Sequence, residues 1–165
     1  MSAAHIPSDA EQFELDPTEH MLLWSFRAMA MGRGDCPMLR AVFGQACGPL
    51  ADQALTALFV LVKQLGWRGR RRLKLHAPGC AKITGDEMLL LAAFAAAQAE
   101  DGGRSLGLWL ERLTDAPPEP PLEASVRMIA DILTRNRCRL PSRDVEIEGP
   151  SAQVLAFRPA SAAMH

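Results

Sequence analysis

Apolar side chains recur every three to four residues over most of this chain, a spacing typical of amphipathic α-helices rather than of strands. The pattern predicts helices at about residues 17–31, 36–47, 49–65, 85–100, 105–113 and 122–137. Asp16 followed by Pro17 is a typical helix start, because proline at the first helical position has no N–H group to leave unpaired. We therefore predict a mainly α fold, built as a compact multi-helix bundle.

The helix at about 85–100 is predicted to lie at the centre of this bundle. Its start carries a capping box, in which Thr84 and Glu87 satisfy each other's backbone N–H groups. No polar side chain occurs from Met88 to Ala97, and a helix that is apolar all round is buried on every side. The apolar run is also shorter than the roughly 20 residues that a bilayer-spanning helix needs.

The end of the chain has a different pattern. Residues 144–148 alternate strictly between polar and apolar side chains, and residues 153–157 are compatible with a second strand. Gly149 and Pro150 between them are turn residues, so we predict a small C-terminal β-hairpin at about 143–158. Because an isolated hairpin is only marginally stable, it should pack on the helices or pair with the alternating residues 72–76.

The length of 165 residues favours one domain. We expect flexible tails at 1–15 and 159–165 around a single domain at 16–158, which contains a proline-rich linker at 116–121. Apolar residues make up 48% of the chain and charged residues 22%, so a sizeable core can form. The N-terminus lacks the basic and apolar regions of a signal peptide, and we expect a cytoplasmic protein with reduced cysteines.

The strongest charge feature is a cluster of five cations within seven residues, directly after Trp67. The cations are Arg68, Arg70, Arg71, Arg72 and Lys74. With the capped helix start that follows, such a cluster can bind phosphate groups, and Trp67 can stack on a base. The net charge of −1 argues against a general polyanion binder but is compatible with a local basic patch. The alternative is a solvated edge strand whose charges prevent aggregation.

A second candidate site consists of Cys36, His76 and Cys80, with an open fourth position on a Zn²⁺ ion. A proline–glycine turn should bring His76 and Cys80 together, and both side chains are ordinary zinc ligands. Cys36 is the third candidate because it begins a helix, where the dipole favours a thiolate. Cys47 cannot share an ion with Cys36, because eleven residues of helix separate them by about 16 Å. The alternative is that Cys47 and Cys138 are small buried apolar residues and His76 is an ordinary loop histidine.

Enzyme signatures do not occur: the chain lacks the glycine–serine motif of hydrolases, the phosphate-binding loop, the zinc-protease motif and the dinucleotide-binding glycines. We therefore name no catalytic residue and expect binding or regulation rather than catalysis. The first hypothesis is a small cytoplasmic accessory or regulatory protein that binds nucleic acid or another anionic partner through residues 68–74. The alternatives are a metal- or thiol-responsive protein using Cys36, His76 and Cys80, and an enzyme with an unrecognised site. A protein partner or a homo-oligomer is compatible with each hypothesis, whereas a membrane partner is not expected.

Overall fold

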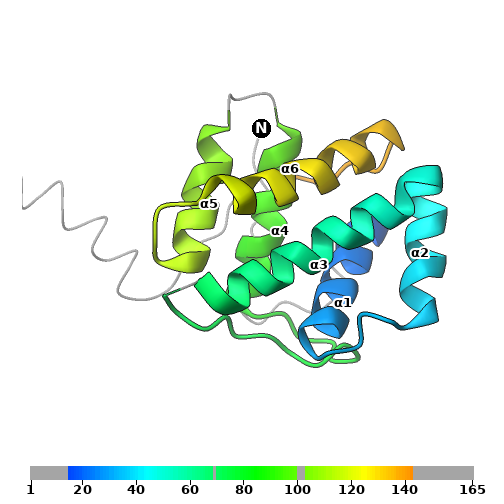
Figure 1. The fold of residues 1–165 in the computed structure, drawn as a ribbon, viewed down its shortest axis with the longest axis horizontal. Coiled ribbons are helices and arrows are strands. Elements are labelled where there is room, and N and C mark those ends of the chain that lie inside the picture. Colours follow the sequence, from blue (N-terminus) through cyan, green and yellow to red (C-terminus); the bar gives the residue numbers. More distant parts are fainter. Residues whose placement is uncertain (1–14, 69, 100–102, 143–165) are drawn as a thin grey trace, which may run out of the picture.

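The computed structural model describes residues 15–68, 70–99 and 103–142 (Figure 1). Its elements are α1 (Pro17–Ala30), α2 (Pro37–Cys47), the short 3₁₀ turn η2 (Gly48–Leu50), α3 (Ala51–Arg68), α4 (Gly85–Gln98), α5 (Arg104–Thr114) and α6 (Pro120–Arg135). No β-strand occurs in these described ranges, and the predicted mainly α bundle is confirmed.

Several predicted features of the two ends lie outside the described residues. These are the hairpin at about 143–158, the tail at 159–165 and residues 1–14 of the N-terminal tail. Leu15 is described and is buried in the core, so the predicted tail at 1–15 is one residue too long. An apolar side chain directly before a capped helix can pack back against that helix, which explains the difference.

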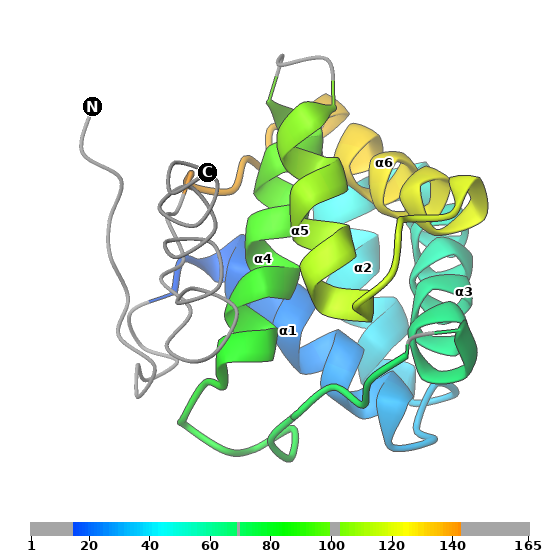
Figure 2. The same ribbon diagram turned by 90° about the vertical axis from the view of Figure 1, so that its left-hand side faces the viewer.

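α4 lies at the centre of the bundle, as its apolar run predicts. It runs antiparallel beside α5 and also packs against α6 and α1 (Figure 2). Every side chain from Met88 to Phe94 is buried. The predicted capping box is present: the N–H of Glu87 donates to Oγ1 of Thr84 over 3.1 Å, and the N–H of Thr84 donates to Oε2 of Glu87 over 2.9 Å. The first turn of α4 therefore has a fixed position against the loop before it.

α3 lies on the outside of the bundle, across α6 and α2 (Figure 1). Its inner face buries the predicted stripe, which includes Ala54, Leu58, Leu61 and Leu65. The helix does not end at Gly66, as the pattern indicates, but continues to Arg68. One glycine costs a helix only about 1 kcal/mol relative to alanine, and the packing of the preceding turn outweighs this. Trp67 therefore lies in the last turn of α3.

The stretch Pro37–Trp67 is long and apolar enough to cross a membrane by length and composition alone. In the structure the chain turns at Gly48, whose φ of 55° is left-handed, and Pro49 follows within η2. α2 and α3 on either side of this turn pack against each other, and Leu39 and Phe43 of α2 are fully buried. The stretch thus forms two helices of the bundle rather than one straight span.

The connection between α5 and α6 is shorter than predicted. α5 ends at Thr114, its C-cap Asp115 has a left-handed φ of 54°, and Glu119 is the N-cap of α6. Pro120 and Pro121 form the first turn of α6, so the predicted linker at 116–121 comprises only residues 116–119. The fixed φ of proline suits the first turn of a helix, where no N–H partner is needed. The same composition therefore fits both a stiff linker and a helix start.

Candidate anion-binding surface

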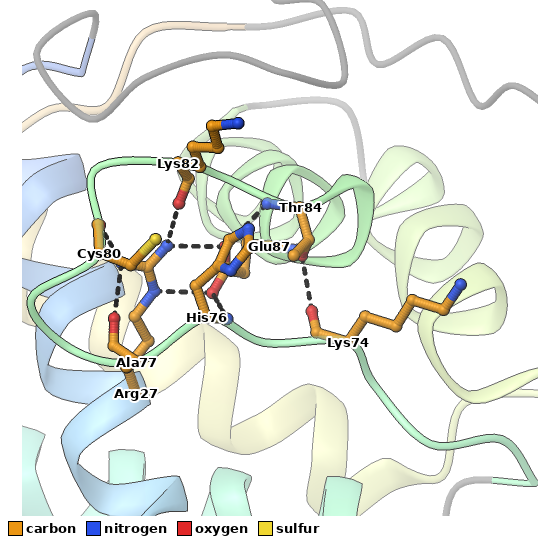
Figure 3. Close-up of polar contacts among 8 residues, drawn as sticks. All are labelled: Arg27, Lys74, His76, Ala77, Cys80, Lys82, Thr84 and Glu87. Atoms are coloured by element: carbon orange, nitrogen blue, oxygen red, sulfur yellow. Dashed lines mark hydrogen bonds and ion pairs between the residues drawn. The ribbon is translucent and has the colours of Figure 1, made fainter.

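The α3–α4 loop, residues 70–84, carries most of the predicted basic segment, and a buried ion pair holds it in place. Arg27 of α1 and Glu87 of α4 both have side chains with 0% exposure. The guanidinium donates from Nε to Oε1 of Glu87 over 2.7 Å and from Nη2 to Oε2 over 2.8 Å (Figure 3). Two parallel hydrogen bonds of this kind fix both the distance and the orientation of the two groups.

The remaining donors of Arg27 bind the backbone of the α3–α4 loop. Nη1 donates to the carbonyl oxygens of Cys80 at 2.9 Å and Ala77 at 3.3 Å, and Nη2 donates to that of Lys82 at 2.7 Å. A guanidinium has five N–H groups, and these contacts together with the ion pair use all of them. The loop therefore wraps around the end of the Arg27 side chain (Figure 3).

Glu87 is held as completely as Arg27. Besides the guanidinium, its carboxylate accepts from the backbone N–H groups of His76 at 3.0 Å and Thr84 at 2.9 Å. A buried charge of this kind is stable only when it is paired and hydrogen-bonded. The capping box is visible in the sequence, whereas the apolar pattern alone does not single out Arg27. The signal that could have found Arg27 is its position on the helix: it follows Leu23 by one helical turn and therefore lies on the buried face of α1 although it is charged.

A second arginine clamp lies at the other end of the loop. Arg71 donates from Nη1 and Nη2 to the two carboxylate oxygens of Asp86, over 3.1 and 2.7 Å. Its Nε donates to the carbonyl oxygen of Arg112 over 3.1 Å, and the N–H of Arg70 donates to that of Thr114 over 2.9 Å. The loop is thereby attached to α4 and to the end of α5. Of the five predicted anion-binding cations, Arg71 is thus engaged within the protein.

Three other cations of the predicted site are exposed, namely Arg70, Arg72 and Lys74. Among the described residues, no carboxylate lies within ion-pair distance of their side chains. The hydroxyl of Thr84 donates to the carbonyl oxygen of Lys74 over 2.6 Å, which ties the backbone of this segment to the start of α4. No Asp or Glu occurs in residues 53–85, so no sequence neighbour neutralises these cations.

Trp67 stands at the start of this segment with 80% of its surface exposed. The ammonium group of Lys63 lies 5.6 Å from its ring centroid and 5.3 Å from the ring centroid of Phe59, within the range of cation–π contacts. Phe59 and Lys63 are not part of the predicted site. The recurrence of Phe59, Lys63 and Trp67 at four-residue intervals is the signal that places them on one face of a helix.

The predicted zinc site is not formed in this structure. Cys36, His76 and Cys80 are all described, yet the described part of the chain contains no group of three His, Cys, Asp or Glu side chains that could hold a metal ion. The predicted turn does exist, because the N–H of Cys80 donates to the carbonyl oxygen of Ala77 over 2.9 Å. It closes around the guanidinium of Arg27, whereas Cys36 is the N-cap of α2 on a different connection. The loop that was predicted to hold a zinc ion therefore holds the guanidinium of Arg27.

The other two cysteines lie close together at the end of α2. Cys47 is fully buried, as predicted, and burial raises the pKa of its thiol to about 11, with the neighbouring Cys138 thiol adding to the shift. Cys138 is only half-buried, and its Sγ donates to the carbonyl oxygen of Ala46 over 3.7 Å. Because the thiolate is the reactive form, both the burial and the raised pKa of Cys47 disfavour its reaction.

The surface that the structure assembles thus differs from the predicted one. We call Trp67 with Arg70, Arg72 and Lys74 the basic surface, and Arg71 supports it from within the protein. No family model matches the chain, and neither does any curated protein or solved structure. A function must therefore be argued from the geometry of the described residues.

Proposed function

We propose that this chain is a small cytoplasmic accessory or regulatory protein that binds an anionic partner through the basic surface. The observation that carries this proposal is the contrast among neighbouring cations of one loop. Arg71 is paired with Asp86, whereas Arg70, Arg72 and Lys74 are exposed and have no described carboxylate within ion-pair distance. Such unneutralised cations attract phosphate or carboxylate groups and accelerate encounter with them.

The fixed backbone of the loop supports the same proposal. The buried Arg27–Glu87 pair and the Arg71–Asp86 pair attach the loop to α1 and α4 before any partner arrives. A loop that is already ordered loses little conformational freedom when it binds, so more of the interaction energy is available for affinity. Trp67 adds a large apolar contact with a rigid ring beside the cations.

The experiment is retention on a heparin column in a salt gradient. The variant Arg70→Ala/Arg72→Ala/Lys74→Ala should elute at much lower salt than the wild type, because each lost contact to an anionic group reduces the salt dependence of binding. The matched control is Arg33→Ala/Arg40→Ala/Arg139→Ala, which removes the same charge from three exposed positions elsewhere. Equal elution of the two triple variants would contradict the proposal, because retention would then follow net charge alone.

A further inference from the structure

The outer side of α3 carries a continuous exposed stripe. At 3.6 residues per turn, its members point to one side of the helix. They are Asp52, Thr56, Phe59, Val60, Lys63 and Trp67, and each of them is exposed. Phe59 is 47% exposed and Trp67 is 80% exposed. An exposed run of large apolar side chains is the usual mark of an interaction site.

A groove between α3 and α6 adjoins this stripe. It has a volume of about 460 Å³ and is lined by Thr56, Ala57 and Val60 from α3 and by Ala124, Ser125 and Met128 from α6. The walls are mainly apolar, and Met128 is 50% exposed at its edge. Methionine adapts its shape readily, which suits a surface that receives apolar side chains of a partner.

Charge is distributed unevenly along this face. Asp52 lies at the beginning of α3 and lines the groove there, whereas Lys63 lies near the far end, between the two aromatic rings. The chain then leaves the end of α3 into the α3–α4 loop, which begins with the exposed Arg70 and Arg72 (Figure 1). The apolar face therefore ends at Trp67, which it shares with the basic surface, and the exposed cations of the loop follow in the chain.

We propose that the anionic partner is a protein whose acidic amphipathic helix docks along α3. This inference rests on the proposed function and names the partner class of the same site. The apolar face of the partner helix lies on Phe59, Trp67 and the α3–α6 groove, and its carboxylates face Lys63 and the basic surface. The stripe spans 15 residue steps, or about 23 Å at 1.5 Å per residue, so four to five turns of a partner helix cover it.

The chemistry of the groove favours this partner over a nucleic acid. Phosphates recur along the whole of a nucleic acid strand, and an apolar groove with Asp52 at one end offers them no counter-charge. A second copy of the chain fits less well, because its own stripe carries a single carboxylate, Asp52, as counter-charge for several cations. An acidic helix matches both the apolar walls and the excess positive charge.

The experiment is selection from a display library of acidic and charge-reversed amphipathic helical peptides on the wild-type protein. We expect enrichment of sequences that place apolar residues at helical spacing and carry an excess of Asp and Glu. The selected peptides should bind Phe59→Ala/Trp67→Ala at least about tenfold more weakly, as is usual when central aromatic contacts are lost. Leu108→Ala/Met38→Ala is the matched control, since both residues are exposed apolar side chains outside the stripe, and it should bind like the wild type.

Other outcomes overturn the inference. Peptides that are not acidic, or that bind the aromatic double variant as well as the wild type, would exclude docking of an acidic helix on this face. The inference also fails if Phe59→Ala/Trp67→Ala abolishes binding of a single-stranded oligonucleotide or of phosphatidylserine vesicles. It fails likewise if the wild type is a dimer in sedimentation and this variant is a monomer. In each of these cases another occupant would use the face.

The failure of this inference is distinguishable from that of the proposed function. If heparin retention depends on Arg70, Arg72 and Lys74 but no acidic helix is selected, the anionic partner is of another class and the proposed function remains. If retention does not depend on these cations, the proposed function fails, and with it the inference that rests on it.

Discussion

The two arginine–carboxylate pairs of the α3–α4 loop are both bidentate but differ in burial. The side chains of Arg27 and Glu87 are 0% exposed, whereas those of Arg71 and Asp86 are 33% and 12% exposed. The two carboxylates are sequence neighbours in the first turn of α4. Removing one partner of a buried pair leaves an uncompensated charge in the core, whereas water can partly solvate the remaining member of a pair nearer the surface. The same chemistry therefore serves folding in one place and positioning in the other.

The two pairs also hold different parts of the loop. Arg27 binds three carbonyl groups at residues 77–82 and so attaches the second half of the loop to the bundle. Asp86 accepts from the backbone N–H of Lys74 over 2.7 Å as well as from Arg71, and so sets the course of the first half. Because the exposed cations lie in the first half, the more exposed pair is the one that positions them.

The largest expected effect is that of breaking the buried pair. Arg27→Met keeps much of the side-chain volume but leaves Glu87 without its charged partner and three loop carbonyls without donors. We expect a loss of about 3–5 kcal/mol in the free energy of unfolding, measured by urea denaturation. Arg40→Met on the exposed face of α2 is the control, and it should change stability by less than about 0.5 kcal/mol. Similar midpoints for the two variants would show that the buried pair is not needed for folding.

A double-mutant cycle sharpens this comparison. Glu87→Leu combined with Arg27→Met removes both charges, so the double variant should lose about 0.5–3 kcal/mol less than the sum of the single losses. It should nevertheless remain less stable than the wild type, because the N–H group of His76 and the loop carbonyls keep no partner. Strict additivity of the two losses in urea denaturation would mean that Arg27 and Glu87 act independently, contrary to the structure.

The helices and the central position of α4 could be predicted because they depend on local spacing. The apolar run from Met88 determines the burial of α4, and the capping box at Thr84 determines where it starts. Both signals lie within a few residues of each other in the sequence. The contacts of Arg27 could not be predicted in this way, since its partner Glu87 is 60 residues away in the sequence. Periodicity shows which face is buried, but not which distant side chain meets it.

The candidate site shows the same limit. The sequence predicts a basic segment at 68–74, and three of its cations are exposed. It does not show that Arg71 is engaged by Asp86, because a carboxylate in a helix cap and a nearby arginine need not meet. Cys36, His76 and Cys80 are chemically suitable zinc ligands, but ligand chemistry does not bring separate connections of the fold together. The turn before α4 instead closes around Arg27, whose distant partners helical spacing does not show.

A smaller effect is expected at the helix cap of α4, which Thr84 forms with Glu87. Thr84→Ala removes the hydroxyl that accepts from the N–H of Glu87 and donates to the carbonyl oxygen of Lys74. The free energy of unfolding should fall by about 0.5–2 kcal/mol, which calorimetry or urea denaturation can measure. Thr84→Ser keeps the hydroxyl and should restore most of the loss. If serine is no better than alanine, the contribution of Thr84 comes from its methyl group and not from the cap.

The smallest effect on stability is expected for the more exposed pair. Arg71→Met should lower the free energy of unfolding by no more than about 1 kcal/mol, because the pair is partly solvated and its attraction is screened. The loss should shrink further at about 1 M salt, where the screening length is about 3 Å. Urea denaturation at low and high salt measures both quantities. A loss as large as that of Arg27→Met would contradict the difference in burial on which the comparison rests.

The same variant should have a larger effect on binding than on folding. Without the Arg71 side chain, the first half of the loop keeps its exposed cations and its two backbone hydrogen bonds, but it loses the guanidinium contacts to Asp86 and to the carbonyl oxygen of Arg112. The segment would then lose conformational entropy on binding, which lowers the affinity. Heparin elution should therefore shift to lower salt by more in Arg71→Met than in Arg40→Met, which removes the same charge. Equal shifts in the two variants would mean that Arg71 contributes only its charge. A larger shift of the elution salt in Arg71→Met, at a nearly unchanged free energy of unfolding, would show that Arg71 positions the loop for binding. Arg27, in contrast, would be the arginine that folding requires.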